Sequence, residues 1–246
     1  MNHLEFQLPS SSPVDEIYPL VDDDPKMSLL DAIYSRRSVR GFLDKKIPQN
    51  ELERILQIAQ HAPSNCNIQP WQVFIATGET KDRLSRTMIE NLKAGIDQNQ
   101  DYEYSGNFVD QYRRRQVDCA VALYNQMGIE RGDKEGRIRG VMRNYEYFDA
   151  PYMAFIGMDE KFSAPVALDI GMYAQTFMLT LRAFGLHSCA MGSMRSYPDL
   201  VREAFGVSSQ TRILFGIAFG YEDESVAANR TRVYRDPIEA NVLIKD

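Results

Sequence analysis

The sequence predicts an α+β fold in which a central β-sheet, mainly antiparallel or mixed, is flanked by helices. Three short runs, at 71–77, 152–158 and 211–220, are rich in the apolar, aromatic and β-branched residues that favour strands. Between them lie longer segments whose apolar residues recur at helical spacing. With 246 residues and 44% hydrophobic composition, the chain is long enough to bury the core of one large domain.

The elements begin after an N-terminal arm. Residues 1–27 contain four Pro and an acidic run, show no sustained periodicity, and are expected to be extended. Ser28 is a suitable N-cap for the first helix, because Asp31 completes a capping-box pattern three residues later. We therefore expect an arm over 1–27 and a single domain over 28–246.

The boundaries of the later elements follow from caps and helix-breaking residues. Asn50 is expected to cap the second helix, which should end before Pro63. Gly78 should end the first strand, and Pro198 fits the first turn of a last helix ending at Gly206. Between these, apolar spacing predicts helices at about 79–98, 112–127 and 133–147, with a loop around 101–107.

The segment 166–184 is predicted to be the central core helix, with Gly185 as its C-cap. It overlaps residues 162–181, the part of the chain most similar to a membrane span. Asp169 and Gln175 interrupt that apolar run, so a buried helix explains it better than a helix in a membrane. We therefore expect no membrane association.

Composition narrows the function classes. The net charge of −6 and pI near 5.2 disfavour nucleic-acid binding, which needs a clustered positive surface. No positive segment followed by an apolar one opens the chain, which favours the cytoplasm. The cysteines, Cys66, Cys119 and Cys189, are odd in number and, like the three His, lack metal-type spacing. We therefore expect reduced thiols and no metal site.

A basic pentapeptide at the end of the first helix is the first chemical signal, Arg36-Arg37-Ser38-Val39-Arg40. Guanidiniums make strong, often bidentate hydrogen bonds to phosphate oxygens, and a hydroxyl adds a neutral donor. The pattern therefore indicates an anion cradle. A solvated helix end, where cations are favoured by the helix dipole, is the alternative interpretation.

The second signal lies after the second helix, in the run Pro63-Ser64-Asn65-Cys66-Asn67-Ile68-Gln69-Pro70-Trp71. Small amides and hydroxyls at fixed spacing end on the only Trp in the chain. Such a segment offers both polar groups and a flat apolar support, as a flavin ring requires, although a polar turn remains the alternative.

Together, these two segments resemble the signature of the nitroreductase family of flavin mononucleotide (FMN) enzymes. The resemblance covers about residues 28–246 and implies an α+β nitroreductase-like domain that forms an intertwined homodimer, with flavin sites at the subunit interface. Arg36 and Ser38 would serve the phosphate, Arg37 its neighbourhood, and Arg40 the N1–C2 region of the ring, with Val39 in the same cofactor-binding segment.

The resemblance assigns further cofactor-binding positions. Pro63, Ser64 and Asn65 would come from the partner subunit, with Asn67 and Gln69 shaping the same loop. The segment after the core helix would pass backbone amides beside the flavin. The remaining matching positions are Ala190, Met191, Gly192 and Ser193 in that segment, and Arg235, or as second choice Arg232, in a C-terminal element that reaches the phosphate.

The implied activity is ping-pong oxidoreduction. NAD(P)H would reduce the flavin by hydride transfer to N5, and a nitroaromatic or quinone-like acceptor would then take the electrons. No side chain is expected to be catalytic, because the cofactor carries the redox chemistry. The resemblance is weakest over 79–148, the region that covers the flavin and selects the small aromatic substrate.

Other interpretations stay open from the sequence. The same fold could carry out reductive dehalogenation or another flavin reaction, or bind flavin without catalysis. A nucleic-acid module built on 36–40 and 113–115 is the weakest alternative, given the acidic composition. A reactive thiol at Cys189 beside His187 is also disfavoured, because neighbours in sequence need not face each other.

Overall fold

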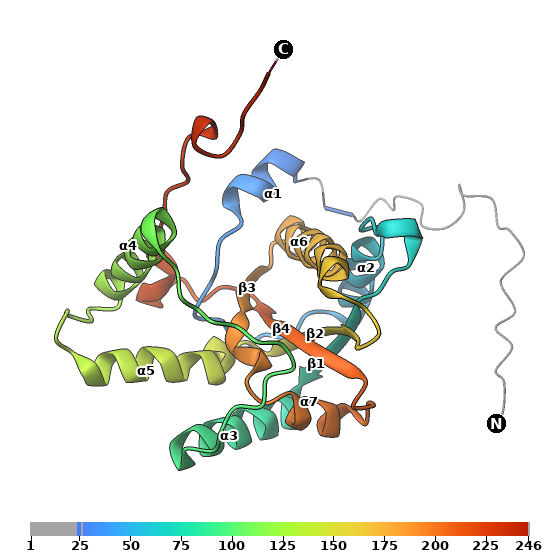
Figure 1. Cartoon of the computed structure of the whole chain (residues 1–246), viewed down its shortest axis with the longest axis horizontal. Helices are drawn as coiled ribbons and strands as arrows, with labels where there is room; N and C mark the ends of the chain where they lie inside the picture. Colours follow the sequence, from blue (N-terminus) through green and yellow to red (C-terminus); the bar gives the residue numbers. More distant parts are fainter. Residues whose placement is uncertain (1–23, 26, 246) are drawn as a thin grey trace, which may run out of the picture.

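The computed structural model describes residues 24–25 and 27–245 (Figure 1). The predicted arm over 1–27 thus falls almost entirely outside the described residues. At the start of the described chain, Asp24 accepts a hydrogen bond of 2.8 Å from Nε of Arg54. Arg54 lies in helix α2 (Gln49–Ala59), so the chain enters the domain in contact with this helix.

A four-stranded antiparallel sheet forms the centre of the fold. Its order is β1-β2-β4-β3, and all three strand pairings are antiparallel. The bounds are Gln72–Thr77 for β1, Tyr152–Asp159 for β2, His187–Met191 for β3 and Thr211–Gly220 for β4. The three predicted strands are confirmed. β3 was not predicted, because its Ser, Cys and Ala residues follow Gly185 and have the composition of a connection.

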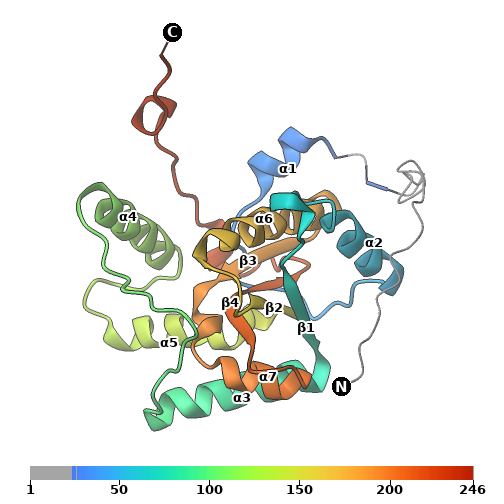
Figure 2. The ribbon, with the colours of Figure 1, turned by 45° about the vertical axis from the view of Figure 1, so that its right-hand side comes forward.

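Seven helices surround the sheet in the described part of the chain (Figures 1 and 2). Besides α2, they are α1 (Leu29–Ser35), α3 (Gly78–Ala94), α4 (Asp110–Gln126), α5 (Lys134–Tyr145), α6 (Ala167–Ala183) and α7 (Pro198–Phe205). The α+β class is confirmed. α4 and α5 lie together at one side of the molecule, away from α2, and the C-terminal segment extends outward beyond α4.

Two predicted helix boundaries were wrong, for local reasons. Pro48, not Asn50, is the N-cap of α2, and its carbonyl accepts the first helical hydrogen bond. Asn50 therefore lies inside the first turn. α3 ends at Ala94 rather than near residue 98, because Gly95 adopts φ +70° and terminates the helix. The Ser28 cap of α1 and the Pro198 start of α7 are confirmed.

The sheet separates two apolar layers. α6 packs on one face, where Tyr173 stacks on Trp71 with ring centroids 4.9 Å apart. α3, α5 and α7 cover the other face, around Phe155. β2 is buried at every position from Tyr152 to Met158, which confirms the predicted central strand. Within the described residues, no helix is both long and apolar enough to span a membrane.

Candidate functional site

The basic segment lies along the free edge of β3. Ser38 forms a parallel bridge with Ser188, and the backbone N–H of Val39 donates to the Ser188 carbonyl at 3.1 Å. The Val39 side chain is fully buried in the core, which fixes the segment. Its neighbours Ser38 and Arg40 remain partly exposed. The segment thus continues the sheet beside β3, where its polar groups can meet a ligand.

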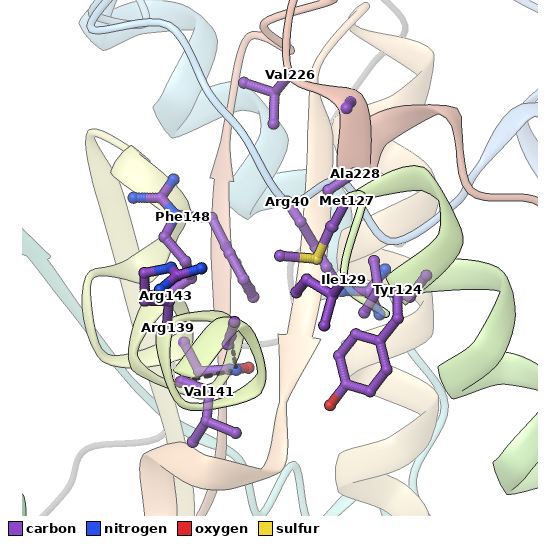
Figure 3. A pocket seen from close by; sticks show the side chains of 15 residues that line it. Arg40, Tyr124, Met127, Ile129, Arg139, Val141, Arg143, Phe148, Val226 and Ala228 are labelled. Carbon is purple, nitrogen blue, oxygen red and sulfur yellow. Dashed lines mark hydrogen bonds between the residues drawn. The ribbon is translucent and has the colours of Figure 1, made fainter. Parts of the chain in front are cut away.

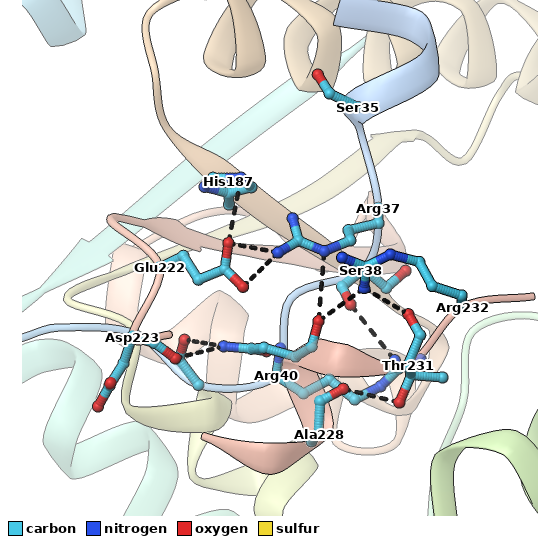
Figure 4. Close-up of polar contacts among 12 residues, drawn as sticks. Ser35, Arg37, Ser38, Arg40, His187, Glu222, Asp223, Ala228, Thr231 and Arg232 are labelled. Atoms are coloured by element: carbon cyan, nitrogen blue, oxygen red, sulfur yellow. Dashed lines mark hydrogen bonds and ion pairs between the residues drawn. The ribbon is translucent and has the colours of Figure 1, made fainter. Parts of the chain in front are cut away.

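Arg37 is anchored by an acidic partner that sequence reasoning missed. Its Nη2 donates to both oxygens of Glu222, at 2.5 and 2.6 Å, and His187 Nε2 lies 3.4 Å from the same carboxylate (Figure 4). Burial, with Arg182 and Arg37 nearby, lowers the pKa of His187 to about 4. Both Glu222 oxygens accept hydrogen bonds from Arg37, so this carboxylate does not raise the pKa of His187 back to its ordinary value.

A buried asparagine ties the basic segment to the C-terminal segment. Asn229 Oδ1 accepts from the backbone N–H of Arg40 at 2.6 Å, and its Nδ2 donates to the carbonyls of Gly41 and Asp223. Its own carbonyl accepts from Nη1 of Arg232 at 2.9 Å. Asn229 is 3% exposed, so these hydrogen bonds are shielded from water. Only tertiary contacts reveal this role, because an Asn alone has no distinctive spacing.

A cavity of about 540 Å³ brings together three predicted cofactor-binding residues from distant parts of the chain, Ser38, Arg232 and Arg235. α4 supplies its other wall through residues that include Arg115 and Cys119. Arg115 forms an ion pair with Asp236. Across the described chain, Arg232 and Arg235 form no ion pair and donate only to backbone carbonyls. Two guanidiniums without an ion-pair partner and a hydroxyl therefore face one cavity, which Asp118 also lines with its carboxylate hydrogen-bonded to the Tyr234 hydroxyl at 3.1 Å.

The remaining residues predicted to bind the cofactor differ in how close they lie to these cavities. Arg36 is the C-cap of α1 and lines neither cavity of this region, whereas Arg40 lines a second cavity beside the first. Gly192 begins a short helical turn directly after β3 and is exposed. The segment also contains exposed Ala190, buried Met191 and half-buried Ser193.

The Pro63–Trp71 segment forms a tight, largely exposed turn at the other edge of the sheet. Ser64 Oγ accepts from the backbone N–H of Gln69 at 3.0 Å, and Asn67 and Gln69 adopt positive φ angles of 58° and 45°. Pro63 and Asn65 are exposed. Such strained, exposed polar backbone is typical of ligand-contacting loops rather than of a simple connection.

Helix α6 shows how far apart the two segments lie in one subunit. The backbone N–H of Asn65 donates to Asp169 in its first turn at 3.1 Å, and Arg182 in its last turn donates to Ser35 at 2.8 Å. At about 1.5 Å per residue, these positions are about 20 Å apart along the helix. β1 and β3 are also opposite edges of the sheet. A single subunit therefore does not bring the two segments together.

The reactive-thiol interpretation fails on geometry. Cys189 is 4% exposed, and burial raises the pKa of its thiol. The Nε2 atom of His187 lies 3.4 Å from the Glu222 carboxylate, so His187 does not serve as a base for the Cys189 thiol. A buried, protonated thiol without a basic partner is a poor nucleophile.

These elements define an α+β protein built on a four-stranded antiparallel sheet, with a basic segment along the edge strand β3. The family model described as "Nitroreductase family" matches residues 33–221, and the chain therefore belongs to the nitroreductase family.

Its similarity to particular members extends over most of the chain. It is 33% identical to nitroreductase NfnB of Mycolicibacterium smegmatis over 223 residues, which cover 88% of this chain and 94% of that protein. The solved structure of NfnB from Mycobacterium smegmatis in complex with NADPH matches with a TM-score of 0.83 and 31% identity, covering 87% of this chain and 96% of that one. The FMN- and NADPH-dependent NfnB from sphigopyxis sp. strain HMH matches with a TM-score of 0.84 and 32% identity, covering 89% and 100%.

Proposed function

We propose that this chain is an FMN-dependent oxidoreductase that takes electrons from NADPH or NADH and reduces a nitroaromatic or quinone-like acceptor. The observation that carries the proposal is the cavity in which Ser38, Arg232 and Arg235 meet, in a chain of this family. Relatives named for FMN, NADPH and nitroaromatic reduction support it, including a 4-nitrobenzoate reductase of Pseudomonas putida at 32% identity.

The cradle residues fit a phosphate. Arg232 and Arg235 offer charged donors that form no ion pair with a described carboxylate, and the Ser38 hydroxyl adds a third donor. Two buried hydroxyls nearby, those of Ser188 and Ser193, have no hydrogen-bond partner among the residues that the structure describes. Such groups are expected to find a partner when a ligand occupies the site. Arg37, held by Glu222, keeps the segment in place rather than binding the phosphate itself.

When bound, FMN supplies the N5 position that accepts hydride and the means to pass the electrons on. The protein positions it. Gly192 leaves the backbone after β3 open to close approach, and its exposed amide is suited to donate to the ring. The Arg40 guanidinium has only the Ser38 carbonyl at 3.4 Å as a described partner, so it can stabilise negative charge on the pyrimidine edge.

We also propose a homodimer whose sites draw on both subunits. Leu168, Gly171, Met172 and Gln175 form an exposed stripe at helical spacing on α6, with Leu168 71% exposed. Two copies of α6 packed antiparallel along this stripe place the start of one helix beside the end of the other. Pro63, Ser64 and Asn65 of one subunit then approach the basic segment of its partner. Asn67 and Gln69 hold the loop.

Other exposed apolar groups support the same assembly. Leu29, Leu30, Ile33 and Tyr34 of α1 are 44–85% exposed, and Leu243 and Ile244 of the C-terminal segment are each 82% exposed. A large exposed apolar surface is typical of an interface. We further infer that 28–246 acts as one FMN-binding domain, and that the free cysteines suit the cytoplasm.

An absorption spectrum of the purified protein tests the function. We expect flavin absorbance that disappears on anaerobic addition of NADPH or NADH and returns when 4-nitrobenzoate is added. Protein that stays colourless after incubation with FMN would contradict the cofactor proposal. Bound flavin that neither nucleotide reduces would instead indicate flavin binding without catalysis.

A further inference from the structure

A second cavity, of about 500 Å³, lies beside the cradle and has a different chemical character (Figure 3). It is enclosed between α4, α5 and the segment 226–228. One side is apolar and consists of Leu123, Tyr124, Met127 and Ile129. Arg40, which belongs to the basic segment, also lines the cavity, so a molecule bound there borders the proposed flavin site.

The opposite side is one face of α5. Gly136, Arg139, Gly140 and Arg143 recur at helical spacing and all line the cavity, and Arg139 and Arg143 lie on the side opposite Met127 and Ile129 (Figure 3). A Cβ at Gly140 would lie 3.6 Å from the methyl group of Met127, in ordinary van der Waals contact, so this face of α5 lies close to the apolar side. The cavity is therefore a slot between an apolar wall and a basic helix face.

The charged side chains that line this cavity are all positive. Three arginines and no carboxylate are among its described lining residues, in a chain with net charge −6. Arg143 is neutralised, since Asp149 and Glu146 accept hydrogen bonds from it at 2.5–2.9 Å and raise its pKa. Within the described chain, Arg139 forms only two ion pairs, both of 3.8 Å, with Asp133 and Glu135, and its side chain is 69% exposed. Such exposed pairs are weak, so the charge of Arg139 remains available.

We propose that this slot receives the electron acceptor as an aromatic carboxylate, with Arg139 as the residue that binds its carboxyl group. The apolar wall packs against the ring, and the guanidinium pairs with the carboxylate through charge-assisted hydrogen bonds. An aromatic acid is ionised at neutral pH, because carboxyl pKa values lie near 4. The inference rests on the proposed function and names its substrate class, nitroaromatic acids rather than neutral nitroarenes.

Matched substrates test the proposal. The ratio of kcat/KM for 4-nitrobenzoate to that for its neutral methyl ester is measured in wild type, Arg139→Gln and Arg137→Gln. Arg137 lies on the same helix, is exposed and does not line the cavity, so it is the control. Loss of a charge-assisted hydrogen bond predicts about a tenfold fall in this ratio for Arg139→Gln and no change for Arg137→Gln. Arg139→Lys should keep part of the preference.

An equal fall for acid and ester, or an unchanged ratio, would overturn the assignment of Arg139. A binding measurement separates this result from failure of the proposed function. Titration calorimetry with benzoate and with neutral benzamide needs no electron transfer. Benzoate should bind wild type at least about tenfold more tightly than Arg139→Gln, whereas benzamide should not distinguish them. Benzoate binding without bleaching by NAD(P)H would refute the activity alone, and bleaching without Arg139-dependent benzoate binding would refute the slot alone.

Discussion

At the residue scale, the proposed anion cradle depends on a few arginines that form no ion pair among the described residues. Arg235 and Arg232 were proposed from a motif, but a basic C-terminal segment in solvent would show the same letters. Their convergence on the cavity with Ser38 gives them a common target. Arg36, by contrast, caps α1 and lies outside that cavity, so its part in phosphate binding remains a prediction.

Arg235→Ala should weaken FMN binding by about tenfold, because one charge-assisted hydrogen bond to the phosphate is lost. Arg230→Ala is the matched control, since Arg230 is exposed in the same segment and does not line the cavity. Fluorescence titration of the apoprotein with FMN gives both affinities. Equal affinities in the two variants would show that the C-terminal element does not bind the phosphate.

His187 should make folding stability depend on pH. Its pKa is about 4 in the folded protein against 6.5 for an ordinary His, so between these values the unfolded chain binds a proton that the folded protein does not. The contribution of neutral His187 to the free energy of unfolding is complete above about pH 6.5 and is lost as the pH falls toward 4. Since the His187 side chain is 13% exposed, we expect the free energy of unfolding to fall by about 2 kcal/mol, less than the full pKa shift would give.

Urea unfolding at pH 7 and pH 4.5, in wild type and His187→Gln, measures this difference. Gln is neutral at both values, so the wild type should lose about 2 kcal/mol more than the variant. Parallel losses would mean that His187 is not held neutral by its surroundings.

At the scale of elements, α6 has two different faces. Tyr173 and Phe177 are buried against the sheet, whereas the stripe from Leu168 to Gln175 is open to solvent in the subunit. Gly171 has no neighbour within 4 Å of the position that a Cβ would occupy. A helix that buries one face and exposes an apolar stripe on another is suited to pack in two directions.

Leu168→Asp should therefore convert the protein to a monomer and reduce its FMN content, without lowering the stability of the subunit. A charge buried in an apolar interface costs several kcal/mol when it is desolvated. Ile138→Asp on α5 is a control at a site of similar exposure, 63%. Light scattering and flavin absorbance give the two readings. A Leu168→Asp protein that stays dimeric would place the interface elsewhere.

At the scale of the whole molecule, the arrangement of the two motifs argues for shared sites. They lie at opposite edges of the sheet and about 20 Å apart along α6. One flavin can meet both only if two subunits contribute. We therefore expect the proposed flavin site to be complete only in the assembled dimer.

Subunit complementation tests this conclusion. One variant carries Arg232→Ala and Arg235→Ala, and the other carries Ser64→Ala and Asn65→Ala; each alone should be inactive. After mixing and reassembly, half of the dimers combine both variants, and each of these has one intact site. Activity should recover to about one quarter of wild type, as two-fold symmetry requires. No recovery would mean that each subunit builds its site alone.

Most of the secondary structure of this protein, and both of its motifs, could be predicted from local sequence. Periodicity and caps located three strands and all seven described helices, because the residues of each element carry its repeat and its end signals. The basic pentapeptide and the Pro63–Trp71 segment were also visible, since both are short and continuous. β3 was not, because its pairing with β4 rather than its composition makes it a strand.

Only the tertiary structure decided how these parts combine. Glu222 and Asn229 hold the basic segment through partners nearly two hundred residues away, a relation that no local spacing records. Likewise, α5 shows in sequence only scattered Gly and Arg, whereas packing against α4 makes them one wall of a cavity. The physical reason is that secondary structure follows from neighbouring residues, while a binding site requires distant segments to meet in three dimensions.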